Sequence, residues 1–74
     1  SISNLTMNLT NGSSFTGAIN SDNQGEVNLT LDTSSNLTLT ADTYLTSLTN
    51  ADSTNSNINL NGHKLYVNGI EWAK

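Results

Sequence analysis

Carboxylates are the potentially reactive groups that recur at a regular spacing in this chain. Asp22, Asp32, Asp42 and Asp52 follow one another at intervals of ten residues. Oxygen-rich loops bind calcium, but each loop here supplies one carboxylate and the Asp-x-Asx-x-Asx-Gly pattern is absent. Because Asp is common in turns, we expect these residues to be solvated turn or capping residues, and we predict no metal site.

The residues needed for catalysis are sparse. The chain has one histidine, His63, and neither cysteine nor arginine. A serine or threonine nucleophile needs a histidine and an orienting acid beside it, and the sequence offers no such grouping. Glu26 and Asp32 flank one predicted strand without converging as the carboxylate pair of a glycosidase does. We therefore expect a protein that is not an enzyme and holds no cofactor.

Three aromatic side chains are the candidates for contact with a ligand or partner: Tyr44, Tyr66 and Trp72. Stacking on sugar rings would require two of them to be coplanar. The alternative is a packing role, in which the aromatics close the last layer of a hydrophobic core or contact a partner. Trp72, near the end of the chain, is placed to cover such a core.

Composition narrows the function classes further. The net charge of the 74 residues is −4, and Lys64 and Lys74 are the only cations. Proteins that bind nucleic acid neutralise phosphates with Lys and Arg, so we exclude that class. There is no apolar run long enough to cross a bilayer. Asn, Thr and Ser number 13, 11 and 10, but low charge and regular apolar spacing favour a β-rich fold over disorder.

Short stretches of alternating apolar and polar residues recur 22 positions apart. Residues 5–9 (Leu-Thr-Met-Asn-Leu) match residues 27–31 (Val-Asn-Leu-Thr-Leu), and residues 15–19 match residues 37–41. Alternation with a period of two predicts half-buried strands. A repeat of this length predicts a solenoid. Polar five-residue turns separate the two strands of each copy, at 10–14 and 32–36.

Two arrangements are compatible with such strands. In a hairpin meander, a two-residue turn at 11–12 would put Leu9 and Phe15 on opposite faces, which the apolar pattern forbids. In a parallel coil, equivalent positions stack about 4.8 Å apart. Leu9 then lies on Leu31, and Phe15 lies on Leu37. We therefore predict a parallel coil with apolar stacks inside and polar stacks outside.

A third, degraded copy is predicted at residues 57–69. We expect its apolar residues at 58–60 to stack on 29–31, and those at 65–67 to stack on 37–39. Tyr66 would then extend the outward row formed by Thr16 and Thr38. A further strand is predicted at 44–48, and a hairpin at Asn61-Gly62 remains an alternative for this copy.

Residues 9–19, 29–48 and 57–69 carry a resemblance to a known group. They are similar to the last repeats of bacterial surface β-helix proteins, which include autotransporter-passenger-like and adhesin-like proteins. The resemblance covers about residues 4–69 and implies a right-handed parallel β-helix of the pectin-lyase-like type, from an exported protein. Phe15 follows the group's pattern of an aromatic after paired serines, whereas Asn36-Leu37 departs from it. The group implies no catalytic residues for this chain.

Together these observations predict one all-β domain over residues 1–74, a right-handed parallel β-helix of about three rungs at the C-terminal end of a longer repeat protein. The expected function is that of a non-catalytic structural or adhesive module, secreted or on a bacterial cell surface. A carbohydrate-binding module that uses one β-face is the alternative, with a glycan as partner. We expect no nucleic-acid binding and no membrane insertion. We also expect self-association, as a homodimer or end to end, because an uncapped first rung exposes Leu5, Met7, Leu9, Phe15 and Ile19.

Overall fold

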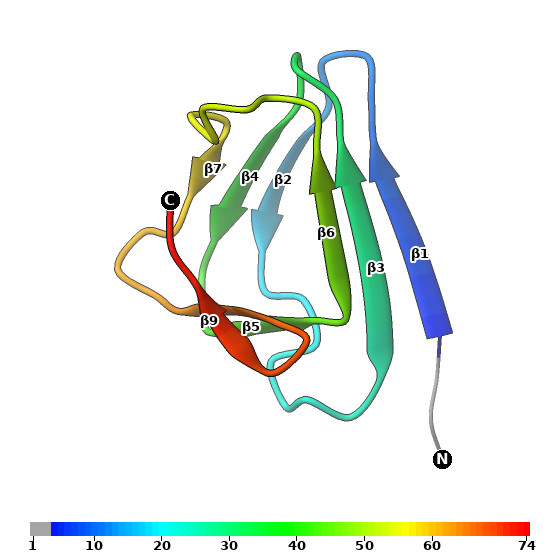
Figure 1. Ribbon diagram of the computed structural model, residues 1–74, viewed down its shortest axis with the longest axis vertical. Helices are drawn as coiled ribbons and strands as arrows, with labels where there is room; N and C mark the ends of the chain where they lie inside the picture. Colours follow the sequence, from blue (N-terminus) through cyan, green and yellow to red (C-terminus); the bar gives the residue numbers. More distant parts are fainter. Residues whose placement is uncertain (1–3) are drawn as a thin grey trace.

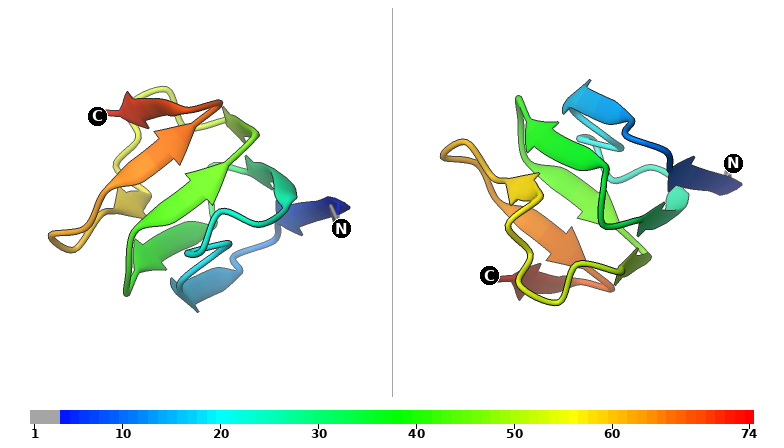
Figure 2. Two further views of the ribbon diagram at one scale, coloured as in Figure 1. Left: turned by 90° about the horizontal axis from the view of Figure 1, so that it is seen from below. Right: turned by 90° about the horizontal axis from the view of Figure 1, so that it is seen from above.

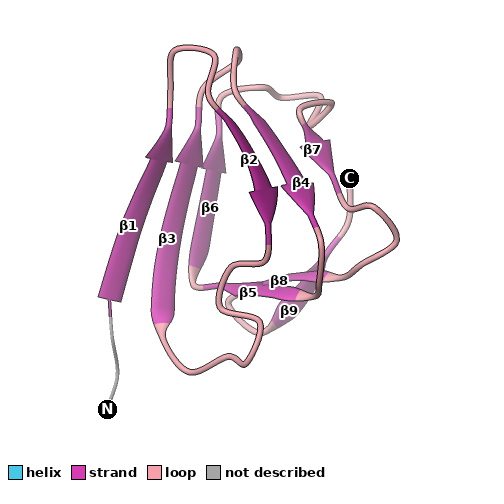
Figure 3. Cartoon of the chain, turned by 180° about the vertical axis from the view of Figure 1, so that it is seen from behind, coloured by secondary structure: helices cyan, strands magenta, loops and turns pink. Residues whose placement is uncertain are grey.

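The computed structural model describes residues 4–74, and all the regular elements in this part of the chain are β-strands (Figures 1 and 3). Nine strands form three sheets of three strands each. The first sheet contains β1 (Asn4–Leu9), β3 (Glu26–Leu31) and β6 (Ser47–Asn50); the second contains β2 (Ser14–Gly17), β4 (Asn36–Leu39) and β7 (Ile58–Asn59); the third contains β5 (Thr43–Leu45), β8 (Leu65–Val67) and β9 (Ile70–Trp72).

The chain passes from sheet to sheet in a repeating order, so that neighbouring strands in each sheet come from successive passes. The paired strands are parallel except for β8 and β9, which are antiparallel. The first pass enters only two sheets, because residues 18–25 form a loop where a strand of the third sheet would lie. The end views in Figure 2 show the three sheets arranged around one interior, which a single cluster of apolar side chains fills.

The first two copies stack as the 22-residue repeat predicts. Leu9 lies opposite Leu31 in the first sheet, and Phe15 lies opposite Leu37 in the second. Side chains alternate along β3, where Val27, Leu29 and Leu31 are buried and the intervening residues are more exposed. The predicted register, and its division into apolar and polar faces, is therefore confirmed for these copies.

The predicted register of the third copy is wrong. Ile58 lies opposite Leu37 rather than Leu29, and the strand that lies on Leu29 is β6, through Leu48. The single strand predicted at 44–48 is in fact two strands, β5 and β6, in two different sheets. A corner at Thr46 separates these two strands, so residues 43–50 belong to two sides of the molecule. As a result, residues 58–59 lie in the second sheet rather than the first, and residues 65–67 lie in the third sheet rather than the second.

This shift also changes the outward row predicted from Thr16 and Thr38. Thr38 is followed by Asn59 in the second sheet, whereas Tyr66 lies opposite Tyr44 in the third. Thr38 and Asn59 are both polar, and Tyr44 and Tyr66 are both aromatic. Not every row is uniform, because Leu31 lies opposite Asn50 in the first sheet. The error therefore lies in the path of the chain and leaves the alternation of each strand intact.

Asparagine supplies the left-handed backbone positions of the turns. All six non-glycine residues with positive φ between residues 4 and 74 are asparagines, the side chain that tolerates this region best. Asn11-Gly12, Asn61-Gly62 and Asn68-Gly69 each place both residues there. Only Asn68-Gly69 joins antiparallel strands, so the hairpin considered at Asn61-Gly62 does not form.

The two ends of the stack differ. At the C-terminal end, β9 pairs along the outer edge of β8, and Trp72 packs against the core. At the N-terminal end, β1 pairs with β3 and with no other strand among residues 4–74. Leu5 there is 50% exposed, but Leu9 and Ile19 are only 7% and 6% exposed. The expected exposure of the first rung is thus correct for Leu5 and wrong for Leu9 and Ile19.

Candidate functional site

Tyr44 and Tyr66 form a stacked pair on the outer face of the third sheet. Thr43 and Leu45 on either side of Tyr44 are buried, so Tyr44 points outward. The strand register places Tyr66 directly opposite it. The ring centroids lie 4.8 Å apart with an angle of 7° between the ring planes. Such aromatic pairs contribute about 0.5–1.5 kcal/mol beyond the area they bury.

This arrangement differs from the platform that a sugar ring would need. The two tyrosine rings lie one above the other, so each covers a face of its neighbour and both side chains are half-buried. Glu71 lies opposite Tyr66 on the next strand and adds one exposed carboxylate to the row. The pair therefore acts as a side-chain ladder between β5 and β8, with its phenol edges towards solvent.

Trp72 belongs to a different environment from the two tyrosines. It lies opposite Leu65, whose side chain is fully buried, and it packs against the apolar core. The three aromatic residues singled out from the sequence are therefore not one site. Two form an outward ladder, and the third covers the core at the C-terminal end.

Asp32 joins the turn of the second copy to the turn of the first. One of its carboxylate oxygens accepts a hydrogen bond from the backbone N–H of Asn11 at 2.9 Å. The other accepts bonds from the Ser34 N–H and from the Ser34 and Ser35 hydroxyls. The Asn11 N–H, followed by the serine hydroxyls, lowers the pKa of Asp32 to about 2, because these donors favour the ionised form.

Two of the other three aspartates, Asp42 and Asp52, also hold turns. Asp52 accepts bonds from Thr54 and Ser56, and these hydroxyls lower its pKa. Asp42 accepts the backbone N–H of Lys64 at 2.9 Å, and His63 Nδ1 lies 3.9 Å from the same oxygen. Between residues 4 and 74, no three His, Asp or Glu side chains gather as a metal ion would require. The spacing of ten residues therefore places these carboxylates in separate turns.

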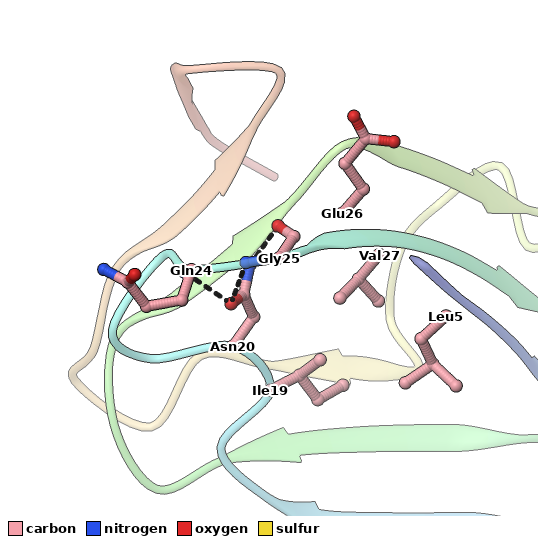
Figure 4. Close-up of a pocket in the computed structure, with 7 residues that line it drawn as sticks. All are labelled: Leu5, Ile19, Asn20, Gln24, Gly25, Glu26 and Val27. Carbon is pink, nitrogen blue, oxygen red and sulfur yellow. Dashed lines mark hydrogen bonds between the residues drawn. The ribbon is translucent and has the colours of Figure 1, made fainter. Parts of the chain in front are cut away.

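The open N-terminal end contains a pocket of about 330 Å³ (Figure 4). Its floor is apolar, formed by Leu5, Ile19 and Val27. The rim is a loop folded around Asn20, whose side-chain oxygen accepts the N–H groups of Gln24 and Gly25. The Asn20 side-chain nitrogen donates to the carbonyls of Gly25 and Tyr44, which ties this loop to β5.

Sequence reasoning missed several buried polar residues that organise the turns. Ser35 and Thr43 are fully buried, and Asn57 is 8% exposed. Asn57 exchanges side-chain hydrogen bonds with Asn50 and donates to the Asp32 carbonyl. The Asp-x-Ser/Thr pattern at 32–34 and 52–54, in which the third residue bonds back to the aspartate, marks two of the turns in the sequence but does not indicate these buried residues.

No family model, curated protein or solved structure matches the chain. Within the described residues, no helix is long and apolar enough to span a membrane.

Proposed function

We propose that this chain is a short right-handed parallel β-helix of about three rungs that serves as a non-catalytic structural or adhesive module. The observation that carries the proposal is the continuous stacking of apolar residues across the parallel ladders. Phe15, Leu37 and Ile58 succeed one another in the second sheet, and the adjacent residues Thr16, Thr38 and Asn59 form a polar row on the opposite face. A stack of this kind builds a rigid rod from small repeated units.

Engineered disulfides test the coil directly, since the chain has no cysteine of its own. Thr16 and Thr38 face one another on adjacent strands, as do Thr38 and Asn59. Adjacent strands lie about 4.8 Å apart, within the range of Cα separations that a disulfide bridges. We expect both cysteine pairs to oxidise in the folded protein.

The matched control places the cysteines at Thr16 and Asn59, which are two strands apart at about 9.6 Å. This pair should stay reduced, because Cα atoms more than about 7 Å apart are not bridged without backbone movement. Rapid oxidation of the control, or failure of both adjacent pairs, would rule out the coil.

We further propose that the open N-terminal end mediates self-association. Among residues 4–74 no strand pairs with the outer edge of β1, and open edges pair with other strands. The half-exposed Leu5 and the apolar pocket also support this step. A symmetric dimer is the form we favour, since the two ends of the stack differ and β9 covers an edge at the other end.

Leu5→Lys should shift the sedimentation equilibrium towards monomer. Thr6→Lys, on the outward face of the same strand, should not, and a wild-type protein that stays monomeric at high concentration would refute this step.

A bacterial surface or secreted location belongs to the same proposal and rests on the resemblance of the repeats. The carbohydrate-binding alternative gains no support from the stacked tyrosines, because they do not lie side by side. A glycan array with calcium and with chelator separates the two functions. Specific binding that Tyr66→Ala abolishes would favour the alternative over a purely structural module.

A further inference from the structure

Three Asn-Gly dipeptides occur in the chain, at 11–12, 61–62 and 68–69. This dipeptide is the most prone to spontaneous deamidation, because glycine has no side chain to hinder attack by its own backbone nitrogen. Asparagine is accordingly one of the thermolabile residues of proteins. The structure separates the three sites, although they share the same dipeptide.

The reaction proceeds in two balanced steps. The backbone nitrogen of glycine forms a bond to the side-chain carbonyl carbon of asparagine, the bond to the side-chain nitrogen breaks, and ammonia leaves with the amide proton. Water then opens the cyclic imide to aspartate or isoaspartate. Attack requires a free backbone nitrogen and a side-chain amide able to turn towards it.

The φ angles do not distinguish the sites. The φ angles of Asn11, Asn61 and Asn68 are 57°, 54° and 51°, and those of the following glycines are 76°, 78° and 79°. All six residues are exposed. The hydrogen bonds of the reacting groups, in contrast, differ among the three sites.

At the first two sites, one reacting group is held. The Gly12 N–H, which is the nucleophile, donates to the Ser34 hydroxyl at 2.9 Å. The Asn61 side-chain nitrogen, which is the leaving group, donates to the Leu39 carbonyl at 3.1 Å. Each bond must break before the ring can close.

At the third site both reacting groups are free. Neither the Asn68 side chain nor the Gly69 N–H has a hydrogen-bond partner among residues 4–74; the Asn68 backbone N–H, which takes no part in the reaction, donates to Leu45. We propose that Asn68, at the tip of the β8–β9 hairpin, is the site of spontaneous deamidation in the folded protein. Conversion to isoaspartate lengthens the backbone of a two-residue turn, which separates β9 and Trp72 from the core.

The test follows deamidation of the intact chain in mildly alkaline buffer by mass spectrometry. Cleavage after Lys64 releases residues 65–74, which contain Asn68 alone, and cleavage after Glu26 separates Asn11 from Asn61. We expect Asn68 to react several-fold faster than either other site in the folded protein, and the three rates to converge in denaturant. Equal rates in the folded protein, or the same order of rates in denaturant, would overturn the proposal.

Ser34→Ala provides an independent test, because it removes the hydroxyl that holds the Gly12 N–H. The rate at Asn11 should rise several-fold while the rate at Asn68 stays unchanged. An unchanged rate at Asn11 in the folded variant would show that this hydrogen bond does not protect the site, and would contradict the proposal.

Discussion

The carboxylate of Asp32 lies 2.9 Å from the backbone nitrogen of Asn11, so one side chain joins turns in two successive passes of the chain. The Ser34 hydroxyl makes a second link of the same kind, to the Gly12 N–H. These bonds lie in exposed turns outside the apolar core. They make the stability of the stack depend on the ionisation of a surface residue.

Stability should therefore fall at acid pH through Asp32. Its folded-state pKa is about 2, below the ordinary value of 3.8. A carboxyl group whose pKa is lowered by folding stabilises the fold at pH values above its unfolded-state pKa. This contribution is lost as the pH falls through the folded-state pKa. We expect Asp32→Asn to lower Tm at neutral pH, and the difference from wild type to shrink between pH 3.8 and about 2.

Asp22→Asn is the matched control for this prediction. Asp22 is exposed, and its carboxylate accepts no hydrogen bond from residues 4–74. Its substitution should leave the melting profile close to wild type. A difference between Asp32→Asn and wild type that persists unchanged below pH 2 would show that ionisation is not the cause.

Adjacent residues of β3 should respond oppositely to a charge. Leu31 is 1% exposed and lies between neighbouring strands, whereas Thr30 is only partly buried and belongs to the outward face. Leu31→Asp should abolish cooperative folding, because it buries an unpaired charge. Leu31→Ala should reduce the free energy of unfolding by about 2–5 kcal/mol. Urea denaturation should show that Thr30→Asp is tolerated. Similar behaviour of the two aspartate variants would mean that the inward and outward faces of β3 are wrongly assigned.

Trp72 should stabilise the domain by covering the core. Because its side chain is half-buried, we expect Trp72→Ala to reduce the free energy of unfolding by about 1–3 kcal/mol, with a smaller loss for Trp72→Phe. Glu71→Ala alters an exposed neighbour and should change the free energy of unfolding by no more than about 0.5 kcal/mol. Equal effects of Trp72→Ala and Glu71→Ala in chemical denaturation would exclude the covering role.

The tyrosine ladder should appear as a coupling energy. A double-mutant cycle of Tyr44→Ala and Tyr66→Ala, measured by urea denaturation, should give a coupling of about 0.5–1.5 kcal/mol. The equivalent cycle of Tyr44 with Trp72 should give little, because Trp72 packs on the inner face. Equal couplings in the two cycles would argue against a direct contribution from ring stacking.

The candidate site could be predicted only in part. The sequence identified Tyr44, Tyr66 and Trp72 as the aromatics to examine, and it assigned turn roles to Asp32 and Asp52. It could not show that Tyr44 meets Tyr66, because that contact depends on where the chain turns a corner at Thr46. It also missed Asn57, because nothing local indicates which of many asparagines becomes buried.

The sequence by itself determined the strands of the first two copies, their inward and outward faces and their 22-residue stacking. These follow from alternation and spacing, which are local properties of the chain. Only the tertiary structure decided how the third pass is shared among the sheets, and which Asn-Gly turn becomes a hairpin. Asn11-Gly12, Asn61-Gly62 and Asn68-Gly69 have similar, positive φ angles. The strand after each turn follows whichever neighbouring edge is available, and that edge is supplied by residues distant in sequence.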